Sequence, residues 1–536
     1  MLGLMQQHPL LISSIIVHAA RHHGDAEVVS RRPGGALSRT TYRDLELRAR
    51  KLAAALAALG AEPGDRIGTI AMNSDRHLEL YYGISGAGMV CNTINPRLSP
   101  DDIAYIANHA EDGILFTDPA FLPTIAAIAP KLRDLHAVVV LCDADAMPTA
   151  DLPPNVALHC YETLLDQTAP IPTWPQFDEN TASGLCYTSG TTGRPKGVLY
   201  SHRASVLHAM MGNCADAMGT RATDRVLLAV PMFHVNAWGV PFGGPMVGAS
   251  LLMPGAQLDA PSLLEMMNAE RATSALGVPT VWLNLLNHLR DKGGAFETLK
   301  RVLIGGAAMP RALMEAYQQL GIRMQQGWGM TESSPMVTVN KPKPACLRLE
   351  GERQIARRCA QGRVLFGADV RAVDDAGNEV PWDGQTPGNM MFRGPWVASG
   401  YYRMPETAVE DWFPTGDVGV IDADGFITLT DRSKDLIKSG GEWISSIAIE
   451  NIAMAHPQVA EAAAIAVPHE KWGERPLLIV VARTGCAPAP DEVRAFCKGK
   501  LPDWSIPDRV VVAESLPHGA TGKVLKTELR KIYARP

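Results

Sequence analysis

One segment of the chain combines residue types suited to holding a string of phosphates. Residues 187–198 read YTSGTTGRPKGV, with three glycines, four serine or threonine hydroxyls and the lysine Lys196. Glycines let backbone N–H groups turn around an anion, hydroxyls add donors, and a lysine adds a point charge, so the segment favours a triphosphate-binding loop. It is not the Walker motif, because Gly197 follows the lysine. Read alone, it could also be an ordinary surface loop with solvated donors.

Four further segments follow in order: GWGMTE at 327–332, PTGD at 414–417, DRSKDLIKSGGEWIS at 431–445 and TGKVLK at 521–526. Together with the glycine-rich loop, they resemble the adenylate-forming superfamily of acyl-CoA synthetases, luciferases and peptide-synthetase adenylation domains. The resemblance runs through essentially the whole chain. It implies an ATP-dependent acyl-CoA ligase, which activates a carboxylic acid as its acyl-adenylate and passes the acyl group to the thiol of coenzyme A.

The resemblance also assigns ATP and Mg²⁺ to particular residues. Thr188 and Glu332 would hold Mg²⁺, a hard cation that takes few protein oxygens and relies on substrate phosphates for the rest. Asp417 would accept both ribose hydroxyls, because a carboxylate has two acceptor oxygens and no donor. Arg432 would assist at the ribose. The residues around the β- and γ-phosphates would be Thr188, Ser189, Gly190, Thr191, Thr192, Gly193 and Lys196.

Trp328 would stack on the adenine ring, at a position where relatives commonly carry tyrosine. The exchange keeps the aromatic face but loses a hydroxyl, and with it the polar role that a tyrosine could play. Read singly, Trp328 is more often a core residue and Asp417 a turn residue, but the shared context favours a nucleotide site. The remaining nucleotide-binding candidates are Gly306, Ala307, Gln326, Gly327, Gly329, Met330 and Thr331.

Lys523, within the TGKVLK segment, is the candidate for the first chemical step. Negative charge builds on the phosphoryl oxygens as a carboxylate attacks the α-phosphate, and an ammonium placed beforehand offsets that charge. Gly522 before it allows close approach. A lysine near the end of a chain is usually only solvated, but its place in this segment favours a catalytic role.

The second step needs no nucleophile from the protein, because the thiol of coenzyme A attacks a good leaving group. Cys186, beside the phosphate loop, is therefore expected to be a small packed residue. In relatives, a small C-terminal domain rotates between the two steps, which removes the catalytic lysine and brings a glycine-rich stretch to the pantetheine tunnel. Lys434 matches the hinge position, and the neighbouring candidates for this step are Lys438, Gly440, Gly441 and Trp443.

The acid is less closely defined. The segments PMFHVNAWG at 231–239 and GGAAMP at 305–310 resemble the walls of an acyl pocket, with His234, Trp238 and Gly305 as substrate candidates. Trp238 matches a tryptophan that gates the acyl tunnel in the branch of medium- and long-chain fatty-acyl-CoA ligases and 3-methylmercaptopropionate-CoA ligases. No basic residue in these segments could receive a second carboxylate, so a monocarboxylate, aliphatic and short- to long-chain, is expected. His234 could equally be a satisfied core histidine.

Several alternatives remain open. The acid could be 3-methylmercaptopropionate or an aryl acid such as cinnamate, and the acyl group could be passed to a separate carrier protein. A luciferase-like oxygenase is another possibility. A nucleotide-binding regulator with decayed chemistry is the alternative outside enzymes, and the presence of both Glu332 and Lys523 argues against it.

The elements that must position these residues alternate between strands and helices. Apolar residues recur at helical spacing between Thr41 and Gly60, with a capping threonine before and a glycine after. Further helices are expected at about 75–87 and 100–110, and strands at 67–72 and 114–117. The Pro-, Asp- and Thr-rich stretch 143–177 is expected to be a surface excursion. This order predicts an α/β domain with layered parallel sheets.

Length and composition frame the domain organisation. A chain of 536 residues is too long for a single hydrophobic core, so two or more domains are expected. Its 46% hydrophobic and 20% charged residues are ordinary values for a globular protein. We expect a large N-terminal ATP- and acyl-binding domain at 1–430, a hinge segment at 431–441 and a small mobile α+β domain at 442–536. The net charge of -6 argues against nucleic acid as a partner. Nine scattered cysteines and the absence of a spanning apolar run favour a reducing, cytoplasmic location, and some relatives are homodimers.

Overall fold

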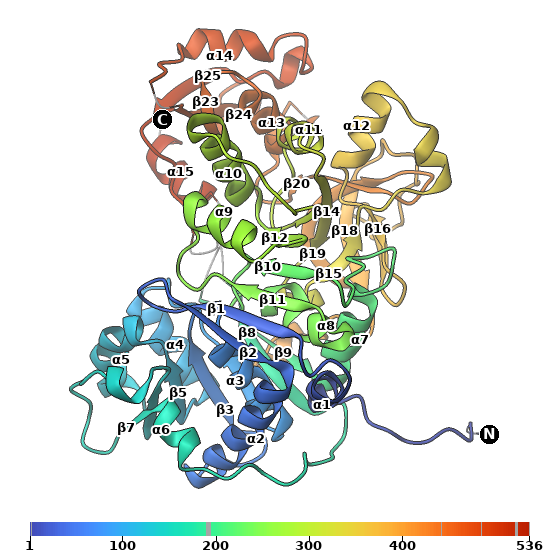
Figure 1. Ribbon diagram of the computed structural model, residues 1–536. Helices are drawn as coiled ribbons and strands as arrows, with labels where there is room; N and C mark the ends of the chain where they lie inside the picture. Colours follow the sequence, from blue (N-terminus) through green and yellow to red (C-terminus); the bar gives the residue numbers. More distant parts are fainter. Residues whose placement is uncertain (2, 189–193, 441, 484, 520–523, 535–536) are drawn as a thin grey trace.

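A computed structural model describes residues 1, 3–188, 194–440, 442–483, 485–519 and 524–534. Two large sheets form the body of the molecule (Figure 1). The first has seven strands in the order β7 (Ala157–Cys160), β6 (Ala137–Val140), β5 (Ile114–Thr117), β3 (Arg66–Ile70), β4 (Val90–Thr93), β8 (Ala182–Tyr187) and β9 (Gly197–Ser201). All of its pairs are parallel except that of β8 with β9.

The second sheet has nine strands, and several of the candidate residues lie in these strands or directly after them. Its middle is parallel, and β2, β15 and β16 pair antiparallel at its two ends. The order is β16 (Arg363–Val364), β15 (Met336–Val339), β14 (Arg323–Gly329), β13 (Arg301–Ile304), β12 (Ser274–Gly277), β10 (Arg225–Leu228), β11 (Ser250–Met253), β1 (Glu27–Arg31) and β2 (Leu37–Thr41).

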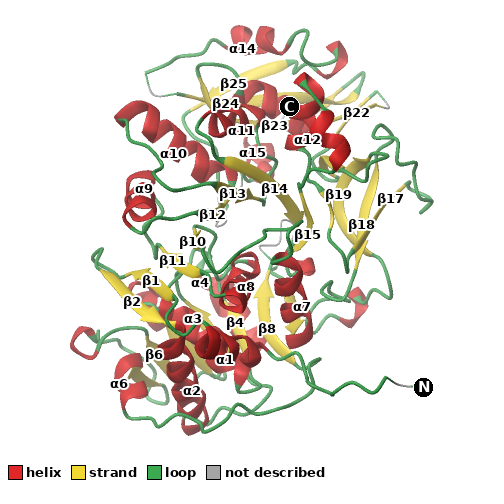
Figure 2. Cartoon of the chain, turned by 45° about the vertical axis from the view of Figure 1, so that its right-hand side comes forward, coloured by secondary structure: helices red, strands yellow, loops and turns green. Residues whose placement is uncertain are grey.

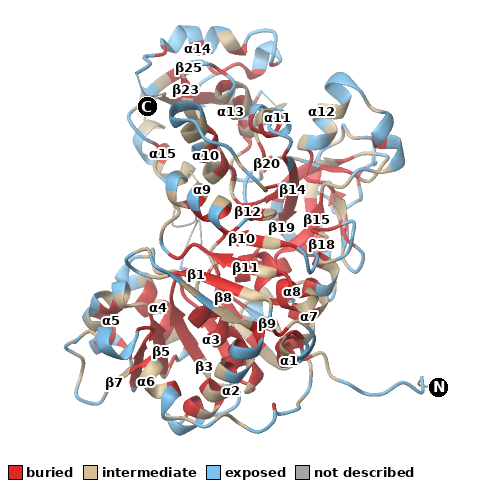
Figure 3. Cartoon of the chain, in the orientation of Figure 1, coloured by how far each residue is buried: buried red, intermediate tan, exposed pale blue. Residues whose placement is uncertain are grey.

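Helices cover both sheets, which explains why the parallel strands are buried on both faces (Figures 2 and 3). The helices of the N-terminal part are α1 (Ile12–His22), α2 (Tyr42–Ala58), α3 (Asp75–Gly86), α4 (Pro100–Ala110), α5 (Leu122–Ile128), α6 (Tyr161–Asp166), α7 (His202–Gly212), α8 (Val240–Val247), α9 (Ala260–Ala269), α10 (Pro279–Lys292), α11 (Arg311–Gln319) and α12 (Gly351–Cys359). Among the described residues, no helix is long and apolar enough to cross a membrane.

Two smaller sheets follow. The first is an antiparallel sheet of β17 (Asp369–Val373), β18 (Gly388–Arg393), β19 (Phe413–Ile421) and β20 (Ile427–Arg432). The second consists of β22 (Glu442–Ile444), β21 (Ile437–Ser439), β24 (Gly473–Ala482), β23 (Val459–His469) and β25 (Arg509–Ala513). It packs with α13 (Ser446–Met454), α14 (Pro490–Cys497) and α15 (Lys526–Tyr533).

The chain passes from the four-stranded to the five-stranded sheet between Arg432 and Ile437, inside the segment expected to be a hinge. The C-terminal sheet lies beside α10 in both views, and Arg483 donates to Asn287 of that helix at 3.2 Å (Figures 1 and 2). The exact domain limits remain a prediction.

Local sequence signals predicted several helices and strands correctly. Thr41 caps α2 by accepting a hydrogen bond from the backbone N–H of Asp44, as expected. The strand at 114–117 and the helix at 100–110 have the expected limits. The expectation of a mere surface excursion at 143–177 is wrong in part. This stretch contains β7, which joins the edge of the seven-stranded sheet, and α6, whose Tyr161 and Leu165 are buried.

Candidate active site

The phosphate loop spans the turn of a β-hairpin. Tyr187, at the end of β8, pairs with Gly197, at the start of β9. Beyond that pair, the backbone N–H of Thr188 donates to the carbonyl of Lys196 at 2.9 Å. The hairpin ladder therefore fixes both ends of the loop, whereas its candidates Ser189, Gly190, Thr191, Thr192 and Gly193 lie outside the described residues.

Glu332 is held beside the loop exit. It lies in a short 3₁₀ turn (Thr331–Ser333) that follows β14, and Glu332 as a whole is 4% exposed. Tyr401 donates its hydroxyl to Glu332 Oε1 at 2.5 Å, and the ring of Tyr401 lies 4.8 Å from the ammonium of Lys196. Burial raises the pKa of the Glu332 carboxyl, while the Tyr401 hydroxyl and the charges of Arg432 and Lys196 oppose that shift. The structure thus brings Glu332 and Lys196 to one aromatic ring.

The donor set fits a magnesium ion that depends on its substrate. A carboxylate and a threonine hydroxyl are the hard oxygen ligands that Mg²⁺ uses with nucleotides. Across the described parts of the chain, no group of three or more histidine, cysteine, aspartate or glutamate side chains could hold a metal alone. Glu332 and Thr188 therefore suit an ion whose remaining ligands come from phosphates and water.

Asp417 lies in strand β19. The interpretation of Asp417 as a turn residue, which its own sequence neighbours favoured, is therefore wrong. It stands opposite Arg432 in the β19–β20 pair, and Arg432 Nε lies 2.7 Å from Asp417 Oδ1. The indole Nε1 of Trp328 donates to Asp417 Oδ2 at 2.8 Å. Strand register and an indole N–H therefore orient this buried carboxylate from two sides.

Trp328 has a polar contact that the sequence did not indicate. Its indole N–H supplies a donor to Asp417, although the exchange from tyrosine removes a hydroxyl. The residue is 7% exposed, and its ring packs edge-on against Phe392 with centroids 6.1 Å apart. Trp328 is therefore both a core residue and a partner of the candidate ribose carboxylate, while stacking on adenine remains a prediction.

The other nucleotide candidates gather where two parallel strands end. Gly306 and Ala307 follow β13, and the segment from Gln326 to Thr331 closes β14 and enters the 3₁₀ turn. The side-chain amide of Gln326 donates to the carbonyl of Ala307 at 3.0 Å, which ties the two strand ends together. Ligands bind preferentially at such carboxyl ends. Gly306 has a φ of 79°, a conformation that favours glycine.

The segment predicted to form an acyl wall contains an unusual turn of backbone. Val235, Asn236, Ala237 and Trp238 have φ angles of 49°, 52°, 42° and 57°, so four consecutive non-glycine residues are left-handed. Such a conformation costs roughly 1–2 kcal/mol per residue and must be held by its surroundings. Nothing in the sequence HVNAWG indicated it.

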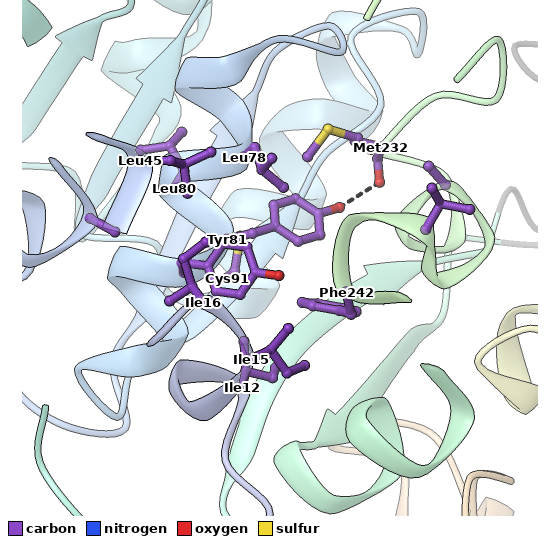
Figure 4. Packing of buried hydrophobic residues seen from close by; sticks show 14 of the residues in the cluster. Ile12, Ile15, Ile16, Leu45, Leu78, Leu80, Tyr81, Cys91, Met232 and Phe242 are labelled. Atoms are coloured by element: carbon purple, nitrogen blue, oxygen red, sulfur yellow. Dashed lines mark hydrogen bonds between the residues drawn. The ribbon is translucent and has the colours of Figure 1, made fainter. Parts of the chain in front are cut away.

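Side chains from other elements hold this turn. Tyr81 of α3 donates its hydroxyl to the carbonyl of Met232 at 2.6 Å (Figure 4). The same hydroxyl lies 3.1 Å from Asn236 Oδ1. The Sγ of Cys186 accepts the backbone N–H of Val235 at 3.4 Å. Cys186 is 1% exposed, and burial raises the pKa of its thiol. Cys186 is packed as expected, and its sulfur also supports the turn.

The turn directs Trp238 toward Gly305. A Cβ atom at Gly305 would lie 3.1 Å from the Trp238 ring, so the glycine leaves room for the indole. Trp238 is 7% exposed. His234 precedes the turn, and its backbone N–H donates to the carbonyl of Pro231 at 3.1 Å. The structure therefore brings Trp238 and Gly305 together, with His234 at the turn's start.

The hinge candidates lie where the small sheet begins. Lys434 follows β20, and its carbonyl accepts a bond of 3.2 Å from Arg530 of α15, which also contacts Asp435 Oδ1 at 2.6 Å. Trp443 stands opposite Lys438 in the β21–β22 pair. Gly440 donates its N–H to the carbonyl of Trp472 at 2.9 Å. Gly441 and the catalytic candidate Lys523 lie outside the described residues.

Sequence reasoning missed Tyr401, Tyr81 and Asn236. Tyr401 reaches Glu332 across 69 residues of sequence, and Tyr81 reaches Asn236 across 155. The only local signal for Tyr401 was a Gly-Tyr-Tyr segment. Such a segment does not indicate which distant carboxylate its hydroxyl contacts.

Two large sheets, a small C-terminal domain and a hairpin loop beside a buried carboxylate together define the adenylate-forming fold. The chain belongs to the AMP-binding enzyme family: its family model matches residues 16–402, and the model of the AMP-binding enzyme C-terminal domain matches residues 448–523.

The chain is similar over nearly its full length to proteins named as CoA ligases. It is 48% identical to a 3-methylmercaptopropionyl-CoA ligase of Ruegeria lacuscaerulensis, covering 99% of this chain and 98% of that one. It is 47% identical to a medium-chain-fatty-acid–CoA ligase of Ectopseudomonas oleovorans, covering 99% of this chain and 98% of that one. The solved anthranilate CoA ligase AuaEII in complex with anthranoyl-AMP has a TM-score of 0.87 at 25% identity, covering 98% and 99% of the two chains. The enzyme class is that of acid–thiol ligases.

Proposed function

We propose that this acyl-CoA ligase acts on a linear aliphatic monocarboxylate, with Mg²⁺–ATP and coenzyme A as co-substrates. The observation that carries the choice of acid is the similarity, at 47–48% identity, to ligases named for 3-methylmercaptopropionate and medium-chain fatty acids. A relative from Thermus thermophilus at 42% identity is named for long-chain fatty acids. These acids share an unbranched chain and one carboxylate, which suits the wall formed by Trp238 and Gly305.

The candidate residues divide the first step between them. Asp417, oriented by Trp328 and Arg432, would accept the ribose hydroxyls. Lys196 and Glu332 would face the triphosphate, with Glu332 and Thr188 as the protein ligands of Mg²⁺, which neutralises phosphate charge when bound. Lys523 would stabilise the charge that develops on the α-phosphoryl group as the carboxylate attacks and diphosphate leaves.

The second step would follow a rotation at Lys434. The chain crosses between two sheets at this position, and hinges at element ends commonly absorb such changes of backbone dihedrals. Lys438, Gly440, Gly441 and Trp443 would then line the path of the pantetheine arm. A homodimer and a cytoplasmic location accompany this proposal as predictions.

The experiment that tests the choice of acid is a substrate panel. Straight-chain acids from acetate to stearate, 3-methylmercaptopropionate and cinnamate are each incubated with ATP, Mg²⁺ and coenzyme A, and AMP release is measured. The highest kcat/KM is expected for a straight-chain aliphatic acid or its thioether analogue. A preference for cinnamate would overturn the aliphatic assignment. Release of diphosphate from ATP without release of AMP in response to coenzyme A would point instead to a carrier protein as acceptor.

A further inference from the structure

Tyr401 contacts three parts of the site at once. Its hydroxyl donates to Glu332 Oε1 at 2.5 Å. The face of its ring lies 4.8 Å from Lys196 Nζ, within the range of a cation–π contact. The ring also packs against Phe413 of β19, with centroids 6.1 Å apart and planes at 72°. One side chain therefore joins the buried carboxylate, the loop lysine and the strand that carries Asp417.

The backbone around Tyr401 is tied to the same two elements. The N–H of Ala398 donates to the carbonyl of Glu332 at 2.7 Å, and the N–H of Tyr402 donates to the carbonyl of Gly197 at 2.8 Å. Thr407 Oγ1 accepts the N–H of Tyr401 itself at 3.0 Å. Residues 398–402 thus bridge the turn of Glu332 and the first residue after the phosphate loop. The backbone that carries the Tyr401 ring is therefore tied to both elements.

A buried carboxylate requires hydrogen bonds that fix its direction, because isolated burial of charge is unfavourable. The Tyr401 hydroxyl provides such a bond to Glu332, and the ring provides an electron-rich face to the ammonium of Lys196. The two charged groups are opposite in sign and approach one residue from its edge and its face. Tyr401 therefore contacts both charged groups at once.

We propose that Tyr401 is a positioning residue that sets Glu332 and Lys196 at a spacing matched to one metal–triphosphate unit. The inference rests on the proposed function, in which Glu332 is a ligand of the metal and Lys196 contacts phosphate. Tyr401 itself acts only through these two groups. Its hydroxyl governs metal binding, and its ring governs the binding of the phosphates.

This division predicts different effects for two substitutions. Tyr401→Phe keeps the ring against Lys196 and Phe413 but removes the hydroxyl from Glu332. Loss of a group that orients a metal ligand typically lowers metal affinity roughly 10- to 100-fold. Tyr401→Leu removes the ring as well, so the nucleotide should also bind more weakly without metal.

The experiment measures binding directly. Free Mn²⁺ is titrated by electron paramagnetic resonance into full-length enzyme saturated with a non-hydrolysable ATP analogue, and binding of the analogue alone is measured by calorimetry with a chelator present. Tyr401→Phe should weaken Mn²⁺ binding by the stated factor and leave metal-free analogue binding unchanged, whereas Tyr401→Leu should weaken both. Tyr317→Phe is the matched control, because it removes a tyrosine hydroxyl that donates to the Trp282 carbonyl at 2.8 Å, away from the site.

Glu332→Gln separates this inference from the function on which it rests. If Glu332→Gln weakens Mn²⁺ binding but Tyr401→Phe binds it like the wild type, the role of Tyr401 is overturned and the metal assignment stands. If Glu332→Gln has no effect, the metal assignment itself is overturned. Circular dichroism of each variant establishes folding. Should Tyr401→Leu unfold, the Tyr401→Phe result decides the role of the hydroxyl by itself.

Discussion

The candidate nucleotide side of the site, around Asp417, is held by strand register, whereas the candidate acyl side, around Trp238, is held by a left-handed turn. Asp417 and Arg432 face each other because β19 and β20 pair in that register. Trp238 instead follows three other residues with positive φ, in a turn supported by Tyr81 and Cys186. The first arrangement uses relaxed backbone, while the second uses backbone that is unfavourable unless neighbouring elements hold it.

This difference suits two binding tasks. A nucleotide has the same ribose and phosphates in every member of the family, and a sheet ladder can hold its partners in one geometry. The acid varies between relatives, and a short turn supported by side chains can be altered without disturbing a sheet. We therefore expect substitutions on the nucleotide side to affect ATP and those on the acyl side to affect the acid.

Lys523→Ala should have the largest effect and tests the nucleotide side. Without the ammonium, adenylate formation should fall by about 10²- to 10³-fold, because one preplaced group for the developing charge is lost. Conversion of supplied acyl-AMP and coenzyme A to the thioester should continue, since that step does not involve the α-phosphoryl transfer. The two half-reactions are measured separately by rapid quench, and equal loss of both would contradict this role of Lys523.

Trp328→Phe tests whether the indole N–H orients Asp417. The ring packing on Phe392 is retained, but a hydrogen bond to a charged group, typically ~1.5–3 kcal/mol, is lost. KM for ATP should rise by roughly tenfold or more, with KM for the acid unchanged.

Trp382→Phe provides the control, because it removes an exposed indole N–H that donates to Glu379 at 3.1 Å outside the site. If Trp328→Phe raises KM for the acid as much as KM for ATP, the two sides are not independent.

The sequence predicted local elements better than long-range contacts, for a physical reason. Strands, caps and the order of the motifs depend on near neighbours, so α2 with its Thr41 cap and the strand at 114–117 were located correctly. The contact of Trp328 with Asp417 spans 89 residues and that of Tyr81 with Asn236 spans 155. Such contacts depend on the assembled fold. Edge strand β7 was missed because its Pro-rich surroundings resemble a loop.

Tyr81→Phe should have a smaller effect, confined to the acyl side. The hydroxyl bond to the Met232 carbonyl is worth about 0.5–1.5 kcal/mol, and its loss should let the left-handed turn relax and move Trp238. KM for the acid should rise about two- to tenfold, with KM for ATP unchanged.

Tyr42→Phe is the matched control, since the hydroxyl of this buried tyrosine donates to the carbonyl of Ala249. Steady-state kinetics across the acid panel provide the measurement. A wild-type profile for Tyr81→Phe would show that the turn does not depend on this bond.

His208→Gln should have the smallest effect on stability at neutral pH. It tests a buried histidine that packs beneath the left-handed turn. His208 Nε2 accepts the backbone N–H of Met336 at 3.0 Å, and a Cβ at Gly239, after the turn, would lie 2.8 Å from its ring. Burial lowers the pKa of His208 to about 4 from its usual 6.5, so the folded protein binds fewer protons than the unfolded chain between those values. The free energy of unfolding should therefore fall as pH is lowered from about 6.5 to 4, by about 3 kcal/mol for this group.

A glutamine keeps an acceptor for Met336 but does not titrate, so His208→Gln should lose less stability over this pH window than the wild type does. Burial also lowers the pKa values of His77 and His202 to about 4. Both proteins should therefore still lose some stability as the pH falls. Denaturant unfolding midpoints at a series of pH values provide the measurement, with His288→Gln as a control on the half-buried face of α10. If wild type and His208→Gln lose stability in parallel, the acyl support is insensitive to this histidine. If the variant is the more resistant to acid, protonation of the buried His208 imidazole accounts for that part of the wild type's loss of stability.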